Sequence, residues 1–249
     1  MVLKKNDQVR EILLKPIDCD KSQSKVYLSE NRVISGQTYY SSADADMSDF
    51  AIGFYEIIYK EVLKGKPILG RKGSLKNSEF AGDTMNSFNT IANCIPGAGK
   101  SSRQRTEKEE WPEYLRGYQT QYHCLANFWI LPMEIGRTTK GKFNKSIKPI
   151  SDYMDRFLQL VKSEVSYNDR DREYFKSFSG WNDFVSKHFL NGYLDNNQQI
   201  ELYSYFDEKG HPNFITSALQ KIEQRATCIA ESEYANELWE YFDELKLFY

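Results

Sequence analysis

Residues 48–65 read SDFAIGFYEIIYKEVLKG, and this stretch shows most clearly how the chain is expected to fold. Its apolar side chains recur three or four positions apart, at Phe50, Phe54, Ile57, Ile58 and Val62. That spacing places them on one face of a helix. A serine precedes the run and a glycine ends it, which is typical of the two ends of a helix. The stretch therefore predicts an amphipathic helix with a buried face.

Similar patterns extend over most of the remaining chain. Helical spacing is found in residues 82–93, 109–129, 151–165 and 172–194, and from about residue 216 onward. Residues 133–149 are polar, basic and glycine-bearing, and they predict a loop. A hairpin around Glu30 and Asn31 is the only strand pairing expected.

These patterns predict a mainly α protein of about seven helices with a small β or irregular N-terminal part. We interpret residues 1–249 as one domain, with a mixed part over 1–45 and a helical body over 46–249.

Composition narrows the functional classes. The chain is 40% hydrophobic and 27% charged, as folded globular proteins are. Its 33 basic and 35 acidic residues give a net charge of −2. Because no overall basic field exists, binding to nucleic acid would depend on a local patch.

Targeting and metal signals are weak in this sequence. The first residues lack the apolar core of a signal peptide, and no run is long enough to cross a bilayer. The four cysteines are scattered, which argues against a zinc knuckle and for reduced thiols. With three histidines in all, a histidine-rich metal site is not expected. We expect a cytoplasmic protein without membrane contact, metal or cofactor.

Two short motifs suggest ligands at first sight. The stretch GAGKSS, residues 97–102, ends like a phosphate-binding loop, but Cys94 stands where the pattern requires its first glycine. Asp44, Asp46 and Asp49 lie close together, as the oxygen ligands of a cation do. Aspartates before a helix are also favoured by the helix dipole. We expect no nucleotide binding at Lys100 and no calcium loop.

Two basic segments, residues 64–76 and 137–148, could form a local patch. On one face of the molecule they would follow a phosphate backbone. Otherwise they are two solvated loops. The second segment includes Arg137, Lys140 and Lys142, and it follows the best candidate for a site.

That candidate is the stretch 114–132, YLRGYQTQYHCLANFWILP. The pattern Tyr122-His123-x-x-x-Asn127-Phe128-x-x-x-Pro132, with an arginine-bearing loop and Asp-Tyr-x-Asp downstream, resembles a family of uncharacterised bacterial proteins. This resemblance covers roughly residues 80–160 and implies no activity.

Two better understood families resemble parts of the same stretch. The segment ANFWILP is similar to the strand that follows the catalytic histidine of HNH-type nucleases. Arg116 and His123 have the spacing of the Arg-x(4–6)-His motif of HEPN ribonucleases, which are helical bundles. That resemblance implies that Arg116 stabilises the scissile phosphate and that His123 moves the proton.

Two functions of different classes follow from these observations. The first is a bacterial or phage-borne hydrolase of a toxin or defence type, acting on RNA or nucleotides. There His123 and Arg116 are catalytic and Asn127 orients the histidine or the substrate. Arg137, Lys140 and Lys142 bind the substrate.

The alternative is a non-enzymatic helical module that binds a protein partner. His123 is then a satisfied structural residue, as we expect for His188, while His211 lies in a turn. The two functions differ in whether His123, Asn127 and a basic side chain converge in one open pocket.

Overall fold

The computed structural model of the chain describes residues 4–17, 45–69, 79–86, 117–118, 121–134, 137–138, 154–166, 173–203 and 214–248. Helices make up most of this part, and a small sheet accompanies them, so the mainly α prediction is confirmed. The hairpin expected around Glu30, the stretch GAGKSS and His211 lie outside the described residues.

The helices are α1 (Lys5–Leu14), α3 (Asp49–Ile58), α4 (Lys60–Leu63), α8 (Met154–Ser166), α9 (Glu173–Lys176), α10 (Trp181–Lys187), α11 (Phe214–Ala230) and α12 (Ala235–Glu244). Three short 3-10 turns are η1 (Ala45–Met47), η4 (Leu125–Asn127) and η5 (Asn191–Tyr193). Within the described ranges, none of the helices combines the length and apolar character needed to cross a bilayer.

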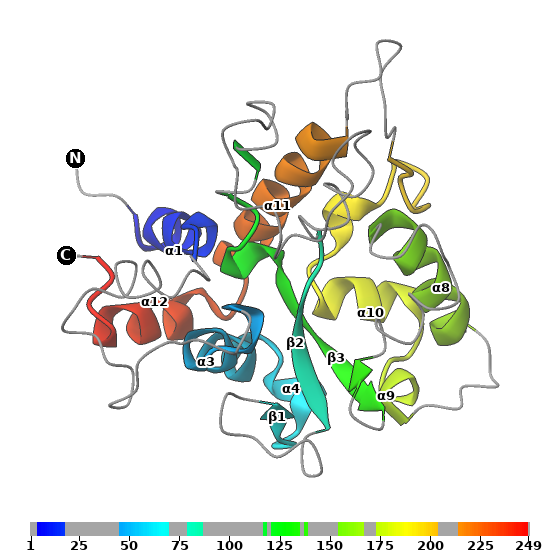
Figure 1. Cartoon of the computed structure of the whole chain (residues 1–249), viewed down its shortest axis with the longest axis horizontal. Coiled ribbons are helices and arrows are strands. Elements are labelled where there is room, and N and C mark those ends of the chain that lie inside the picture. Colours follow the sequence, from blue (N-terminus) through cyan, green and yellow to red (C-terminus); the bar gives the residue numbers. More distant parts are fainter. Residues whose placement is uncertain are drawn as a thin grey trace, which may run out of the picture.

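A four-stranded sheet crosses the middle of the molecule (Figure 1). Its order is β1 (Ile68–Leu69), β2 (Phe80–Thr84), β3 (Phe128–Glu134) and β4 (Arg137–Thr138), and only the β1–β2 pair is parallel. Figure 1 shows α1, α3 and α12 on one side of β2 and β3, with α8, α9 and α10 on the other. Residues 128–131 of β3 are fully buried, as expected for a strand covered on both faces.

The opening stretch is helical, as predicted, but it forms two helices in place of one. Ser48 caps α3, because its hydroxyl accepts a hydrogen bond from the Ala51 N–H at 3.2 Å. The apolar face of α3 is buried, and a break at Tyr59 separates it from α4. The backbone then turns through left-handed conformations at Lys64 and Gly65, which ends the helical stretch.

Three segments differ from their predicted structure. Residues 82–84, expected to begin a helix, belong to strand β2. The helix predicted over 109–129 is wrong at its end, where η4 leads into β3. The loop predicted over 133–149 is wrong at its start, because β3 continues to Glu134 and Arg137 begins β4. A buried strand lacks the alternation of polar and apolar residues that separates strand from helix, so the apolar run of β3 predicts a helix from sequence alone.

The first and last helices of the described chain pack together. The indole N–H of Trp239 in α12 donates to Gln8 Oε1 of α1 at 3.0 Å, and the Lys5 ammonium lies 4.2 Å from the Trp239 ring. Arg10 of α1 donates to the Thr227 hydroxyl of α11 at 3.0 Å. Helix α1, which was not predicted, thus joins the two C-terminal helices.

One buried arginine connects the helices to the sheet. Arg225 of α11 is 1% exposed and donates to the carbonyls of Ala126 at 2.7 Å, Phe128 at 2.8 Å and His188 at 3.1 Å. Its remaining nitrogen donates to the Tyr59 hydroxyl at 2.8 Å. A single side chain therefore joins α11 to the start of β3, the end of α10 and the α3–α4 break.

Strand β2 passes very close to η1. The Tyr55 hydroxyl donates to the Asp46 carbonyl at 2.9 Å, and the Thr84 hydroxyl donates to the Asp46 carboxylate at 2.7 Å. A β carbon added to Gly82 would lie 1.7 Å from the same Asp46 carbonyl oxygen. Only glycine allows this approach of two backbones.

We therefore expect Gly82→Ala to lower the free energy of unfolding by about 3 kcal/mol or more, because backbone atoms on both sides have to move apart. Urea unfolding monitored by circular dichroism measures the change. Gly117→Ala is the matched control, since a β carbon there meets no atom within 4 Å. An equal effect of the two substitutions would contradict the close approach.

Candidate functional site

The structure describes part of the predicted site. His123 precedes Cys124 and η4, and Asn127 is the last residue of η4, immediately before β3. Arg137 lies in β4, but its side chain is not among the described ones. Arg116, Lys140 and Lys142 are outside the described residues. The geometry of the site is therefore that of His123 and Asn127.

The side chain of Asn127 is fully buried and engaged at both ends. Its oxygen accepts hydrogen bonds from the Asn86 backbone N–H at 3.0 Å and the Asn86 amide at 3.1 Å. Its amide nitrogen donates to the carbonyl oxygens of Tyr122 at 2.7 Å and Asn86 at 3.2 Å. This amide thus holds the end of β2 against the turn before β3.

Three tyrosines complete the hydrogen bonds of Asn86. The Tyr118 hydroxyl donates to the Asn86 carbonyl at 2.7 Å, and the Tyr203 hydroxyl donates to its side-chain oxygen at 3.0 Å. The Asn86 amide donates to the Tyr193 hydroxyl at 2.9 Å. Buried polar groups that are this completely paired are typical of a structural network.

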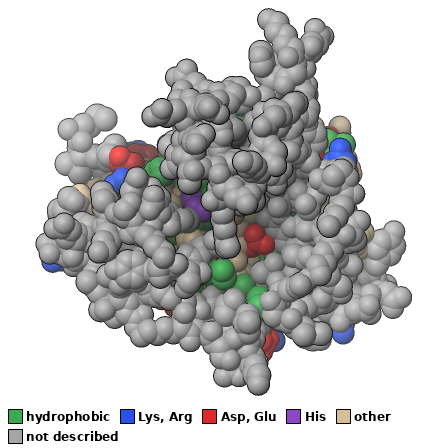
Figure 2. Space-filling model, in the orientation of Figure 1, with side chains coloured by type: hydrophobic (Ala, Val, Ile, Leu, Met, Phe, Trp, Pro, Cys, Tyr) green, Lys and Arg blue, Asp and Glu red, His purple; other side chains and the backbone are tan. Residues whose placement is uncertain are grey.

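His123 lies next to this network and is partly buried. Its ring is 3.9 Å from that of Tyr122 and meets the Phe128 ring edge-on at 5.9 Å. Figure 2 shows a histidine side chain reaching the surface beside apolar side chains. Removal from water lowers the pKa of His123 from 6.5 to about 3. The imidazole is therefore neutral at pH 7, and it is a weak base.

His188 is a packing residue, in agreement with the prediction. It is fully buried and stacks on Phe184 with ring centroids 4.1 Å apart. Its Nδ1 is 3.0 Å from the Phe184 carbonyl oxygen. Burial lowers the pKa of His188 to about 3. The neutral ring also contacts the aromatic rings of Tyr59 and Trp129.

Of the three aspartates considered as ligands of a cation, the structure describes two, and both lie within or beside helical turns. Asp44 lies outside the described residues. Asp46 is buried and accepts a hydrogen bond from Thr84, and Asp49 lies in the first turn of α3. Across the described part of the chain, no three His, Cys, Asp or Glu side chains are placed to hold a metal ion together.

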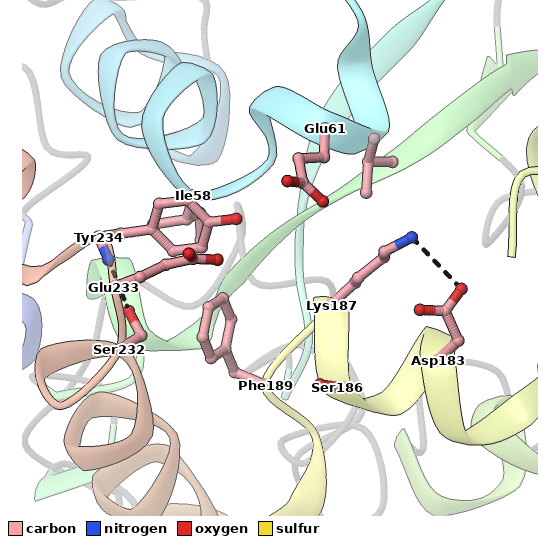
Figure 3. A pocket seen from close by; sticks show the side chains of 10 residues that line it. Ile58, Glu61, Asp183, Ser186, Lys187, Phe189, Ser232, Glu233 and Tyr234 are labelled. Atoms are coloured by element: carbon pink, nitrogen blue, oxygen red, sulfur yellow. Dashed lines mark hydrogen bonds and ion pairs between the residues drawn. The ribbon is translucent and has the colours of Figure 1, made fainter.

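A cleft of about 380 Å³ opens on another part of the molecule (Figure 3). It lies between the α3–α4 region, the C-terminal end of α10 and the turn that joins α11 to α12. Its lining residues are Ile58, Glu61, Val62, Asp183, Ser186, Lys187, Phe189, Ser232, Glu233 and Tyr234. Neither His123 nor Asn127 is among them, so the cleft is separate from the part of the predicted site that the structure describes.

Charge and aromatic side chains give the cleft its character. Lys187 pairs with Asp183 at 3.3 Å, while Glu61 and Glu233 form no ion pair with any described residue. Tyr234 is 8% exposed, and its pKa is raised to about 12, first by burial and then by Glu233 and Glu61. The cleft is therefore anionic around a buried phenol.

Sequence reasoning did not single out these residues. Glu61 and Glu233 come from distant parts of the chain, and each is an exposed acidic residue beside a helix end. No spacing within one segment distinguishes them from solvated charges. Nothing in the sequence distinguishes Phe189 either. Only in the structure does it stand out, because it adopts a left-handed backbone with φ of 57° at the end of α10.

The first prediction for this region concerns Asn127→Asp, which keeps the shape of the side chain. The carboxylate would face the carbonyls of Tyr122 and Asn86 without a proton to donate. We expect a loss of roughly 2–5 kcal/mol in the free energy of unfolding at pH 7, measured by urea denaturation. The control Asn182→Asp is exposed and should change stability by less than about 0.5 kcal/mol. A similarly small change for Asn127→Asp would refute the structural role.

The second prediction concerns pH. Because the folded pKa values of His123 and His188 are about 3, the unfolded chain binds protons near pH 6.5 that the folded chain does not. These two histidines therefore do not reduce the free energy of unfolding above pH 6.5, and they reduce it increasingly as the pH drops toward 3. From pH 7 to 5.5 we expect a loss of about 2–3 kcal/mol in urea unfolding. His123→Gln should remove about half of this loss, and an unchanged pH dependence would contradict the lowered pKa of His123.

Comparisons of the chain with models of protein families, with curated proteins and with solved structures find no match. The resemblance of residues 114–132 to the bacterial family, to HEPN ribonucleases and to HNH-type nucleases stays a prediction. The function is therefore inferred from the residues of this chain alone.

Proposed function

We propose that this chain is a non-enzymatic helical interaction module that binds a protein partner. The observation that carries this proposal is the saturation of the Asn127 amide by four hydrogen bonds, all within the buried network. An asparagine that orients a catalytic histidine or a substrate needs its side-chain oxygen or its amide nitrogen free for that contact. Here each group already stabilises the junction of β2 and β3.

His123 supports the same conclusion. General acid–base catalysis is most efficient when the pKa of the catalytic group lies near the working pH. The pKa of His123 is about 3, which leaves a neutral imidazole that is both a weak base and a poor proton donor at pH 7. Its contacts with Tyr122 and Phe128 are those of an aromatic packing residue.

The cleft also fits binding better than catalysis. Its serine hydroxyls have no histidine beside them among the lining residues, and Ser232 donates to the Ile229 carbonyl at 2.7 Å. An excess of carboxylates repels the phosphates of RNA and nucleotides. A protein partner with a basic surface is not repelled in this way.

The RNA- or nucleotide-directed hydrolase remains the competing hypothesis. It requires Arg116 to face His123, with Lys140 and Lys142 beside the substrate. A direct activity test separates the two functions, because only the hydrolase depends on the imidazole of His123.

The test has two measurements on the full chain. We expect no turnover of single-stranded RNA or of nucleoside triphosphates by the parent protein. We also expect a photoreactive residue placed at Ser186, inside the cleft, to yield a discrete protein adduct in the native cell. The same residue at the exposed Glu240 is the control and should yield none. RNA or nucleotide turnover that His123→Gln abolishes without changing the melting temperature would overturn the module.

A further inference from the structure

The cleft has two negative charges more than it has positive ones. Its lining contains three carboxylates, of Asp183, Glu61 and Glu233, and one ammonium group, of Lys187. Since Lys187 and Asp183 pair with each other, the two glutamates account for the excess. Glu61 extends from α4 and Glu233 from the α11–α12 turn, and Figure 3 shows both carboxylates at the same opening. A ligand that enters between them meets negative charge on two sides.

The walls between these carboxylates are apolar and aromatic. Ile58 and Val62 are buried residues of its lining, and Tyr234 is 8% exposed. The rings of Phe189 and Tyr234 meet edge-on with centroids 6.2 Å apart. These walls match an aliphatic chain, while the carboxylates match a cation at its end. The combination favours a long amphipathic cationic group over a metal ion or a small anion.

Tyr234 already contacts one cation of the protein itself. The Lys60 ammonium lies 5.1 Å from the centre of the Tyr234 ring and pairs with Glu237 at 3.1 Å. Aromatic rings attract ammonium groups in this way, and neighbouring carboxylates strengthen the attraction. The Lys60 pair shows within the structure the kind of contact that the cleft offers to a second cation.

We propose that the cleft binds a lysine side chain from an exposed segment of the partner protein. The four methylene groups lie against Phe189 and Tyr234, and the ammonium group lies between Glu61 and Glu233. Two carboxylates on separate elements suit the three divergent donors of an ammonium better than the planar fork of an arginine. The inference rests on the proposed function, whose partner chemistry it specifies.

The probe is the blocked tripeptide acetyl-Gly-Lys-Gly-amide, titrated into the ¹⁵N-labelled full chain at low salt. Its isostere with norleucine in place of lysine has no charge and is the probe control. We expect the lysine peptide to shift the amide signals of Glu61, Phe189 and Tyr234, with a dissociation constant at least tenfold lower than that of the norleucine peptide. Added salt at 0.5 M should weaken only the lysine peptide, because it screens the carboxylates.

Three variants, one of them a control, locate the binding. Glu61→Gln/Glu233→Gln should raise the dissociation constant at least tenfold. Glu56→Gln/Glu240→Gln removes the same charge from exposed positions outside the cleft and should change it less than twofold. Phe189→Gly removes an aromatic wall while glycine accepts the left-handed backbone, so it should weaken binding in a folded protein.

The inference would be overturned by no shifts at the cleft, by equal binding of the norleucine peptide, or by equal effects of the two double variants. n-Butylammonium carries the same methylene and ammonium groups, so it should compete with the lysine peptide for the cleft, and a failure to compete would also overturn the inference. If Ser186 yields a cleft-dependent protein adduct but the cleft shows no preference for lysine, the interaction module is supported and the lysine inference is refuted. RNA or nucleotide turnover that depends on His123 would refute the proposed module itself.

Discussion

The Arg225 guanidinium is the contact on which the arrangement of the described chain depends. Moving a cation out of water costs several kcal/mol, and the attraction of carbonyl dipoles has to offset that cost. Arg225 meets three backbone carbonyls and the Tyr59 hydroxyl, each at hydrogen-bond distance. Its planar fork reaches three separate elements at once, which a lysine does not do. If any of these elements moved away, a buried N–H group of the guanidinium would lose its acceptor, so the guanidinium fixes them together.

This constraint extends directly to the predicted site. The carbonyls of Ala126 and Phe128 that Arg225 holds are those of the two residues on either side of Asn127. The backbone at Asn127 is therefore fixed, and its side chain points into the network with Asn86. A motif that resembles catalytic sequences thus has a sufficient physical reason to contain these residues. The same asparagine that suggests chemistry in the sequence holds the turn into a strand whose residues 128–131 are fully buried, and the histidine packs beside that turn.

The sequence predicted what depends on local periodicity, and it failed where tertiary packing decides. Ser48 as a cap and the apolar face of α3 follow from spacing alone, and so do most of α8, α11 and α12. Helix α1 was missed although Val9, Ile12 and Leu13 have helical spacing. The strands were missed because β3 is covered on both faces and β2 carries Gly82 for a close approach. Arg225 has no local signal, since a basic residue in an amphipathic helix is usually solvated.

The cleft illustrates how partial enclosure changes the surroundings of ordinary charged residues. Glu61 and Glu233 are exposed acidic side chains, and in open water such charges attract a cation by no more than about 1 kcal/mol. Beside Phe189 and Tyr234 they face a partly enclosed space with a lower dielectric, where the same attraction is stronger. The Phe189 backbone keeps a left-handed conformation that favours glycine, and its ring forms one wall of this space. The aromatic side chains around this cleft therefore distinguish it from other acidic parts of the surface, because they strengthen the attraction between the two glutamates and a cation.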